Sequence, residues 1–119
     1  MITSNVQESS SSPLADRFRT YLPVVIDIET GGFNSATDAV LEISAVILNM
    51  DKDEKLVIDQ TFFSRVIPFE GSNIEDSALK FTGIDPYHPL RVARPEKVVF
   101  QNMFKLVRDA MKSLSLIHI

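Results

Sequence analysis

Two carboxylates stand two residues apart near the beginning of the chain. Asp27 and Glu29 follow directly on the apolar run Val24–Ile26, which is typical of a strand buried on both faces. Residues two apart in a strand point to the same face, and two neighbouring anions in a dry strand repel and are costly to desolvate. A divalent cation offsets both problems, and hard oxygen ligands suit Mg²⁺ or Mn²⁺. An exposed strand end with two solvated acids is the alternative.

The elements that must position this pair follow from the apolar patterns along the chain. Strands are predicted at Val24–Ile28, Ala39–Leu48 and Leu56–Ile67, and helices at Ile74–Phe81 and Pro95–Lys112. Early strands followed by helices suggest an α/β domain whose sheet is only partly supplied by these residues.

Glycine, asparagine and proline residues set the expected ends of these elements. Gly31 and Gly32 predict a turn after the carboxylates, and Gly83 predicts a helix stop. Asn73 is predicted to cap the first helix, and Pro95 to be the first residue of the second.

Composition bounds the class of protein. The chain has 119 residues, 45% hydrophobic and 24% charged, which is ordinary globular chemistry for a single domain. It has no cysteine, so disulfides and thiolate metal sites are excluded. With a net charge of −4, any contact with nucleic acid must come from a local basic patch or from metal ions. No secretory signal or membrane span is apparent, so a cytoplasmic protein is expected.

Residues 24–33, VVIDIETGGF, resemble the first motif of the DEDD exonuclease superfamily, whose domains have a ribonuclease-H-like fold. The wider match, from about Asp16 to Lys112, is to the ribonuclease T family. It includes Asp16–Arg19, Tyr21–Glu29, Gly32–Asn34, Thr37–Ala39, Leu41–Ile43, Pro68, Phe69, Gly71, Asn73, Phe81, Gly83–Pro86, Phe104, Lys105, Val107 and Arg108.

This resemblance implies an activity for the carboxylate pair. Asp27 and Glu29 correspond to catalytic residues that hold two metal ions, expected to be Mg²⁺ with Mn²⁺ possible as a substitute. The implied enzyme is a 3′→5′ exoribonuclease that removes one nucleoside monophosphate at a time from the 3′ ends of tRNA and other structured RNAs. The implied fold is ribonuclease-H-like but incomplete, with the first three strands and about two helices.

The resemblance also implies residues that bind the substrate. Phe33 and Phe81 match phenylalanines that stack on terminal bases; the alternative for both is packing in the core. Ser77 departs from the family pattern, which commonly has glutamate there for discrimination of the terminal base, so an inherited base preference is in doubt.

Basic residues share one face of the last predicted helix. The resemblance to the family implies that they contact the RNA backbone. The spacing of Lys105, Arg108 and Lys112 fits one face, and Arg17 and Arg19 could join the patch. The family is homodimeric, with basic residues of one subunit holding RNA for the other, so a homodimer is expected for the full-length protein. A solvated helix face is the alternative for these side chains.

Two further ionisable residues are not assigned to catalysis. Glu42 lies in the middle of the second predicted strand and is interpreted as a structural hydrogen-bond partner, with a metal role as the alternative. His88 is expected in a loop, and no base role is assigned to it.

The chain divides into three expected parts: a flexible tail at 1–13, the amino-terminal part of an exonuclease domain at 14–113, and a non-native tail at 114–119. The last segment, LSLIHI, breaks the resemblance and equals the translation of a sequencing-library adapter. The family's second aspartate motif, its histidine and its last aspartate are not found. The 119-residue chain is therefore expected to be inactive by itself, with an open apolar sheet edge.

Other functions remain open at this point. A DNA-directed proofreading or repair exonuclease of the same superfamily, acting on single-stranded DNA, would carry the same motif. A catalytically silent form that dimerises or binds nucleic acid is the alternative outside the enzymes.

Overall fold

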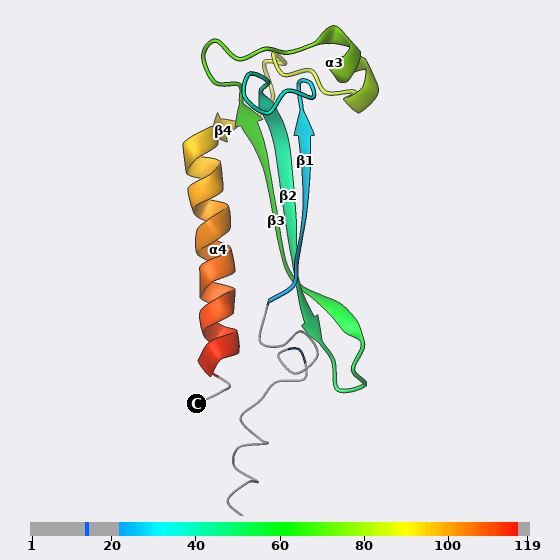
Figure 1. The fold of residues 1–119 in the computed structure, drawn as a ribbon, viewed down its shortest axis with the longest axis vertical. Helices are drawn as coiled ribbons and strands as arrows, with labels where there is room; N and C mark the ends of the chain where they lie inside the picture. The colour runs from blue at the N-terminus through cyan, green and yellow to red at the C-terminus, as the bar shows by residue number, and fades with distance from the viewer. Residues whose placement is uncertain (1–13, 15–21, 117–119) are drawn as a thin grey trace, which may run out of the picture. The chain divides into compact units, whose positions relative to one another are not determined.

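The computed structural model describes Leu14 and residues 22–116, with side chains through residue 113. Arg17, Arg19, the expected tail at 1–13 and residues 117–119 lie outside the described residues. The elements, in chain order, are β1 (Val24–Thr30), β2 (Val40–Met50), β3 (Leu56–Ile67), α3 (Asp76–Thr82), β4 (Arg94–Pro95) and α4 (Glu96–Leu116) (Figure 1).

The strands form one four-stranded sheet in the order β1-β2-β3-β4. Figure 1 shows β2 running opposite to β1 and β3. β4 pairs in parallel with the end of β3, Val66 with Arg94 and Ile67 with Pro95. This mixed sheet with its helices confirms the predicted α/β class. The third predicted strand has the observed bounds, whereas β1 runs two residues further and β2 is shifted towards its carboxyl end.

The described residues divide into two compact units. One lies within 1–25, 46–61 and 104–119, and the other consists of Ile26–Ala45 and Phe62–Met103. In the second unit, alternate residues of β2 (Leu41, Ile43, Ala45) are buried, as a strand with one face on the core requires. The second unit contains both predicted carboxylates and both predicted stacking phenylalanines, and it is the unit that carries the site.

β1 is exposed, contrary to the prediction from its apolar sequence. Ile26 and Ile28 retain 47% and 41% of their surface. The reason is the strand order, because β1 is at the edge of the sheet and has a neighbour only on the β2 side. The β-branched run thus predicted the strand correctly but not its burial.

The start of α3 corrects another prediction. The residue at its amino-terminal cap is Glu75, with no hydrogen bond from a side chain, and the helix begins at Asp76 rather than Ile74. The Asn73 side chain instead donates to the Asp38 carboxylate, 3.0 Å away. The end is as predicted: Gly83 adopts a left-handed conformation (φ 74°) and donates its N–H to the Leu79 carbonyl at 2.8 Å.

The start of α4 differs by one residue for a similar reason. Pro95 pairs with Ile67 as part of β4, and Glu96 is the first residue of the helix. Val99 and Met103 are each 1% exposed and anchor the first turns of α4 in the core of the second unit. The helix continues to Leu116, past the predicted end at Lys112. No described helix has the length and apolar character needed to cross a membrane.

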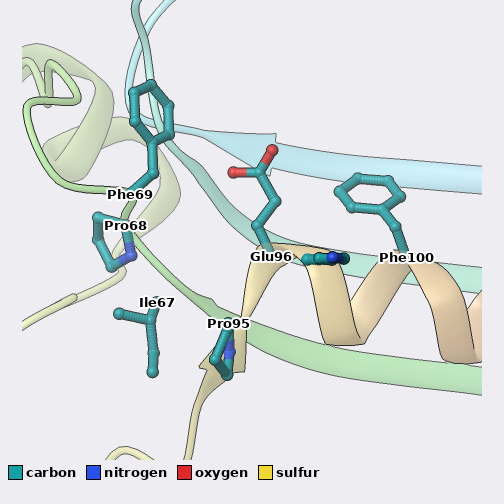
Figure 2. Close-up of a pocket in the computed structure, with 7 residues that line it drawn as sticks. Ile67, Pro68, Phe69, Pro95, Glu96 and Phe100 are labelled. Atoms are coloured by element: carbon teal, nitrogen blue, oxygen red, sulfur yellow. The ribbon is translucent and has the colours of Figure 1, made fainter.

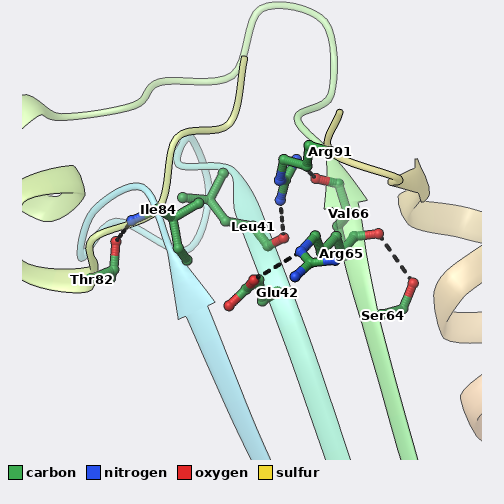
Figure 3. Close-up of polar contacts among 8 residues, drawn as sticks. All are labelled: Leu41, Glu42, Ser64, Arg65, Val66, Thr82, Ile84 and Arg91. Carbon is green, nitrogen blue, oxygen red and sulfur yellow. Dashed lines mark hydrogen bonds and ion pairs between the residues drawn. The ribbon is translucent and has the colours of Figure 1, made fainter. Parts of the chain in front are cut away.

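The loop between α3 and β4 is attached to the sheet by one side chain. The Arg91 guanidinium donates to the carbonyl oxygens of Val66 at 3.1 Å and of Leu41 at 2.6 Å (Figure 3). Beside it, Arg65 and Glu42 form an ion pair at 3.5 Å. Desolvation lowers the pKa of Arg91, and the Glu42 carboxylate opposes that shift. Arg91 therefore connects β2, β3 and the loop in the second unit.

Candidate active site

The carboxylate pair lies on β1 as the sequence predicts. Asp27 and Glu29 are two residues apart in a regular strand, so both side chains project from the same face. Asp27 is exposed and Glu29 is half-buried. Because neither acid has a salt-bridge partner among the described residues, nothing in this part of the chain neutralises the pair.

Glu29 forms part of the wall of a cavity of about 350 Å³, within the size range of small-molecule sites. Its wall consists of Ile28, Glu29, Thr30, Gly32, Phe33, Ser77, Ala78, Phe81 and Thr82. One side is thus the end of β1 and its turn, and the other is α3. Asp27 is not among the lining residues. The structure brings together the glutamate, both predicted stacking residues and Ser77, which are as many as 52 positions apart along the chain.

Both phenylalanines of this cavity are exposed. Phe33 retains 102% of its surface and Phe81 retains 90%. Packing in the core, the alternative for each, is therefore not their role in this structure. Two exposed rings beside a carboxylate offer flat apolar surfaces to a ligand with an aromatic ring.

The turn that presents Phe33 is fixed by backbone and side-chain hydrogen bonds. The Gly31 N–H donates to the Ala39 carbonyl at 2.8 Å, and the Gly31 carbonyl accepts from the Glu75 N–H at 2.7 Å. The Thr30 hydroxyl donates to the Gly32 carbonyl at 2.7 Å. The end of β1 is thereby joined to the residue that caps α3, which carries the opposite wall of the cavity.

Close packing explains both glycines of the turn. A Cβ atom at Gly32 would overlap the carboxylate of Asp38, and one at Gly31 would lie 3.1 Å from the Asn73 carbonyl oxygen and the Ile74 Cα. The sequence predicted a turn here, but the need for glycine comes from the close approach of Asp38 in the following loop and of Asn73 and Ile74 before α3.

Asp38 is a buried carboxylate that the sequence did not single out. It is 7% exposed and accepts hydrogen bonds from the Asn34 N–H at 2.8 Å, the Thr37 hydroxyl at 3.0 Å and the Asn73 side-chain amide at 3.0 Å. The bond from Asn34, followed by that from Asn73, lowers the pKa of Asp38 against the opposing effect of burial. Its partner Asn73 is 35 positions away, so no local pattern could have found it.

The carboxylates of β1 fit a hard divalent cation by donor chemistry, because they are two negatively charged oxygen donors on one face of the strand, with Glu29 at the cavity. Among the described residues there is no group of three or more His, Asp or Glu side chains that could hold a metal. Asp27 and Glu29 can therefore supply part of a ligand set.

The predicted basic stripe lies on α4 and in the other unit from Phe104 onwards. Lys105, Arg108 and Lys112 are exposed. Lys105 forms an ion pair with Asp109 at 2.9 Å, and this hydrogen bond and charge lower the pKa of Asp109. Exposure is compatible with both the solvated face and the RNA contacts.

Glu42 and His88 have structural contacts. Glu42 is ion-paired with Arg65, in agreement with the interpretation of Glu42 as a structural partner. His88 lies in the loop before β4, where its Nδ1 accepts a hydrogen bond from the Leu90 N–H at 3.1 Å.

A larger cavity, about 490 Å³, lies elsewhere in the second unit (Figure 2). Its wall is Ile67, Pro68, Phe69, Pro95, Glu96, Lys97 and Phe100. Glu96 Oε2 is buried there without a hydrogen-bond partner. This cavity contains neither carboxylate of β1, and we assign the candidate site to the smaller cavity for that reason.

Comparison with known proteins identifies the family of the chain. Residues 24–113 match the model of the exonuclease family. Ribonuclease T of Hahella chejuensis is 52% identical over 110 residues, which are 92% of this chain and 50% of that protein. The chain thus spans about half the length of this curated relative.

Solved structures agree on the fold. Escherichia coli exonuclease I, solved in complex with a dA13 oligonucleotide, superposes with a TM-score of 0.57 at 19% identity, over 70% of this chain and 17% of that one. Cell-death related nuclease 4 gives a TM-score of 0.54 at 20% identity, over 73% and 30%. The described residues therefore share the ribonuclease-H-like fold of these nucleases. The sheet and the β1 carboxylates agree with the family match, which extends from residue 24 to residue 113. This chain therefore belongs to the exonuclease family.

Proposed function

We propose that this chain supplies the amino-terminal half of a metal-dependent 3′→5′ exoribonuclease. Its substrates are the 3′ ends of tRNA and other structured RNAs, and its products are nucleoside monophosphates. The observation that carries the proposal is the cavity in which Glu29 lies beside two exposed phenylalanines. The identity to ribonuclease T supports the choice of RNA.

In this proposal the residues of the chain divide into two roles. Asp27 and Glu29 hold Mg²⁺, and the other ligands come from the rest of the whole protein. Held by these two carboxylates, the metal would supply activation of a water molecule and stabilisation of the leaving 3′ oxygen. Phe33 and Phe81 stack on the terminal bases and hold the last phosphodiester near the carboxylates. Gly32 and Thr30 fix the turn between the metal-binding Glu29 and the stacking Phe33.

Ser77 suggests weak discrimination among terminal bases. It lies in the cavity wall on α3, and its hydroxyl can either donate or accept a hydrogen bond. A hydroxyl can therefore satisfy different base edges, whereas a carboxylate only accepts. We propose that stacking, which every base can provide, contributes more to binding here than readout of base edges.

The proposal also covers the assembly of the whole protein, its contacts with the RNA backbone and the limits of its domain. The whole protein is a homodimer, and the RNA backbone is contacted by Arg17, Arg19, Lys105, Arg108 and Lys112. Residues 14–113 form the amino-terminal part of the exonuclease domain, and 114–119 are a non-native tail.

The test is an assay of the whole protein on RNA labelled at its 5′ end. A single-stranded 3′ overhang on a hairpin should shorten one nucleotide at a time with Mg²⁺ and remain intact with a chelator. The same overhang made of DNA measures the preference for RNA. Faster digestion of DNA would favour a proofreading or repair exonuclease, and binding without metal-dependent cleavage would favour a silent nucleic-acid-binding protein.

A further inference from the structure

Asp38 lies between the two segments that carry the walls of the cavity. One segment, 31–39, contains Phe33, and its Asn34 N–H donates to Asp38 Oδ2 at 2.8 Å. The other, 73–75, leads into α3 and Phe81, and its Asn73 side chain donates to Asp38 Oδ1 at 3.0 Å. One carboxylate therefore holds a donor from each side.

The backbone of the same two segments is joined as well. Asp38 and Asn73 form an isolated parallel bridge. The Ala39 N–H donates to the Asn73 carbonyl at 3.1 Å, and the Asn73 N–H donates to the Thr37 carbonyl at 2.8 Å. The Gly32 backbone is in close contact with the Asp38 carboxylate. Movement of one segment would thus break contacts on both.

We propose that Asp38 is a positioning residue that sets the separation of the Phe33 and Phe81 rings. This inference rests on the proposed function, in which the two rings hold the terminal bases. Asp38 does not line the cavity, so it acts through the loop and α3 and not by contact with substrate. Loss of its carboxylate leaves the pair of rings free to spread apart.

The donors around Asp38 define which substitutions it tolerates. Three groups donate to it, and a carboxylate accepts all of them. An asparagine at 38 can keep the bond from Asn34 and donate to residue 73, provided that residue 73 turns an oxygen towards it. Aspartate at 73 offers only oxygens, so Asp38→Asn with Asn73→Asp exchanges donor and acceptor. Asn73→Asp alone places two carboxylates about 3 Å apart, where like charges repel.

The first arm of the test measures hydrogen exchange in the whole protein and does not require activity. In Asp38→Ala and in Asn73→Asp, amides of both 31–39 and 73–75 should exchange at least about tenfold faster, as local opening becomes easier. In the double variant, Asp38→Asn with Asn73→Asp, the amides of both segments should exchange at rates close to those of the wild type. Faster exchange in only one segment, or no recovery in the double variant, would overturn the inference.

The second arm measures KM and kcat for a short RNA. Asp38→Ala should raise KM roughly tenfold, the scale of one lost base stack, and change kcat less. In a Phe33→Ala/Phe81→Ala background the same substitution should leave KM unchanged, because there are no rings to position. An equal loss in both backgrounds would show a merely structural role. If the wild type does not cleave RNA, the proposed function fails, while the exchange arm still decides whether Asp38 holds the two segments.

Discussion

At the scale of single residues, exposure and ion pairing distinguish the side chains that we propose to be functional from the structural ones. Phe33 and Phe81 are the most exposed phenylalanines of the described chain, although packing in the core was the alternative for each. Glu42, an acid on the neighbouring strand, is paired with Arg65, whereas the acids of β1 have no such partner within the described part of the chain. The family resemblance implied the roles of the phenylalanines, and their exposure distinguishes them from core residues. Ion pairing, rather than exposure, distinguishes Glu42 from Glu29.

Removal of the rings should weaken binding more than it slows the reaction. Phe33→Ala and Phe81→Ala should each raise KM for a short RNA in the whole protein about tenfold, since stacking contributes about 1–3 kcal/mol per base. Steady-state kinetics would measure this. Tyr87→Ala is a matched control, because Tyr87 is 73% exposed but does not line the cavity. An equal effect of all three substitutions would contradict the assignment of the cavity.

Asp38 should make stability depend on pH in the acid range. Its hydrogen bonds lower its pKa in the folded protein, so the stabilisation is present above the ordinary aspartate pKa of about 4. It is lost as the pH falls through the lowered pKa. The melting temperature of the wild type should therefore exceed that of Asp38→Asn at pH 7, and the difference should shrink below about pH 4. A difference that is constant from pH 7 to pH 3 would contradict this.

At the scale of elements, local signals predicted those features that depend on neighbours in sequence. The bounds of β3 were predicted as observed, because residues alternate across Phe63, Arg65 and Ile67 and Pro68 follows the strand. Gly83 ends α3 as expected. The two-residue strand β4 leaves no local pattern, and the start of α3 was wrong because the Asn73 side chain bonds to Asp38 instead of capping the helix. Burial of β1 depends on strand order, which no local pattern specifies.

The turn after β1 should not tolerate a larger residue at Gly32. In Gly32→Ala the new methyl group would meet the Asp38 carboxylate, and we expect a loss of about 1–3 kcal/mol in the free energy of unfolding, as for other overpacked sites. Denaturant melts would measure it, and KM for RNA should rise as well.

Gly71→Ala is the control for this substitution. Gly71 has a φ of 81° but open space around its Cα, so alanine costs roughly 1–2 kcal/mol through backbone conformation alone. It should leave KM unchanged. If Gly32→Ala behaved in the same way, the turn would not be positioning the cavity.

At the scale of the whole molecule, the described residues form both sides of the candidate cavity but only part of a metal-ligand set. β1 presents Asp27 and Glu29 at one edge of the sheet, and no third acid or histidine joins them among the described residues. The chain spans half of its curated relative. The sequence predicted the class and the carboxylate pair through a specific motif, whereas the cavity required the folded positions of α3 and the turn.

The most direct test of the account is metal-dependent cleavage by the whole protein with Glu29 altered. The wild type should release single nucleotides from a 3′ RNA overhang in Mg²⁺, and Glu29→Gln should lose at least about a hundredfold in kcat, because an amide cannot replace a charged metal ligand. Glu70→Gln, at an exposed glutamate outside the cavity wall, should retain full activity. Equal activity of Glu29→Gln and the wild type would contradict the account.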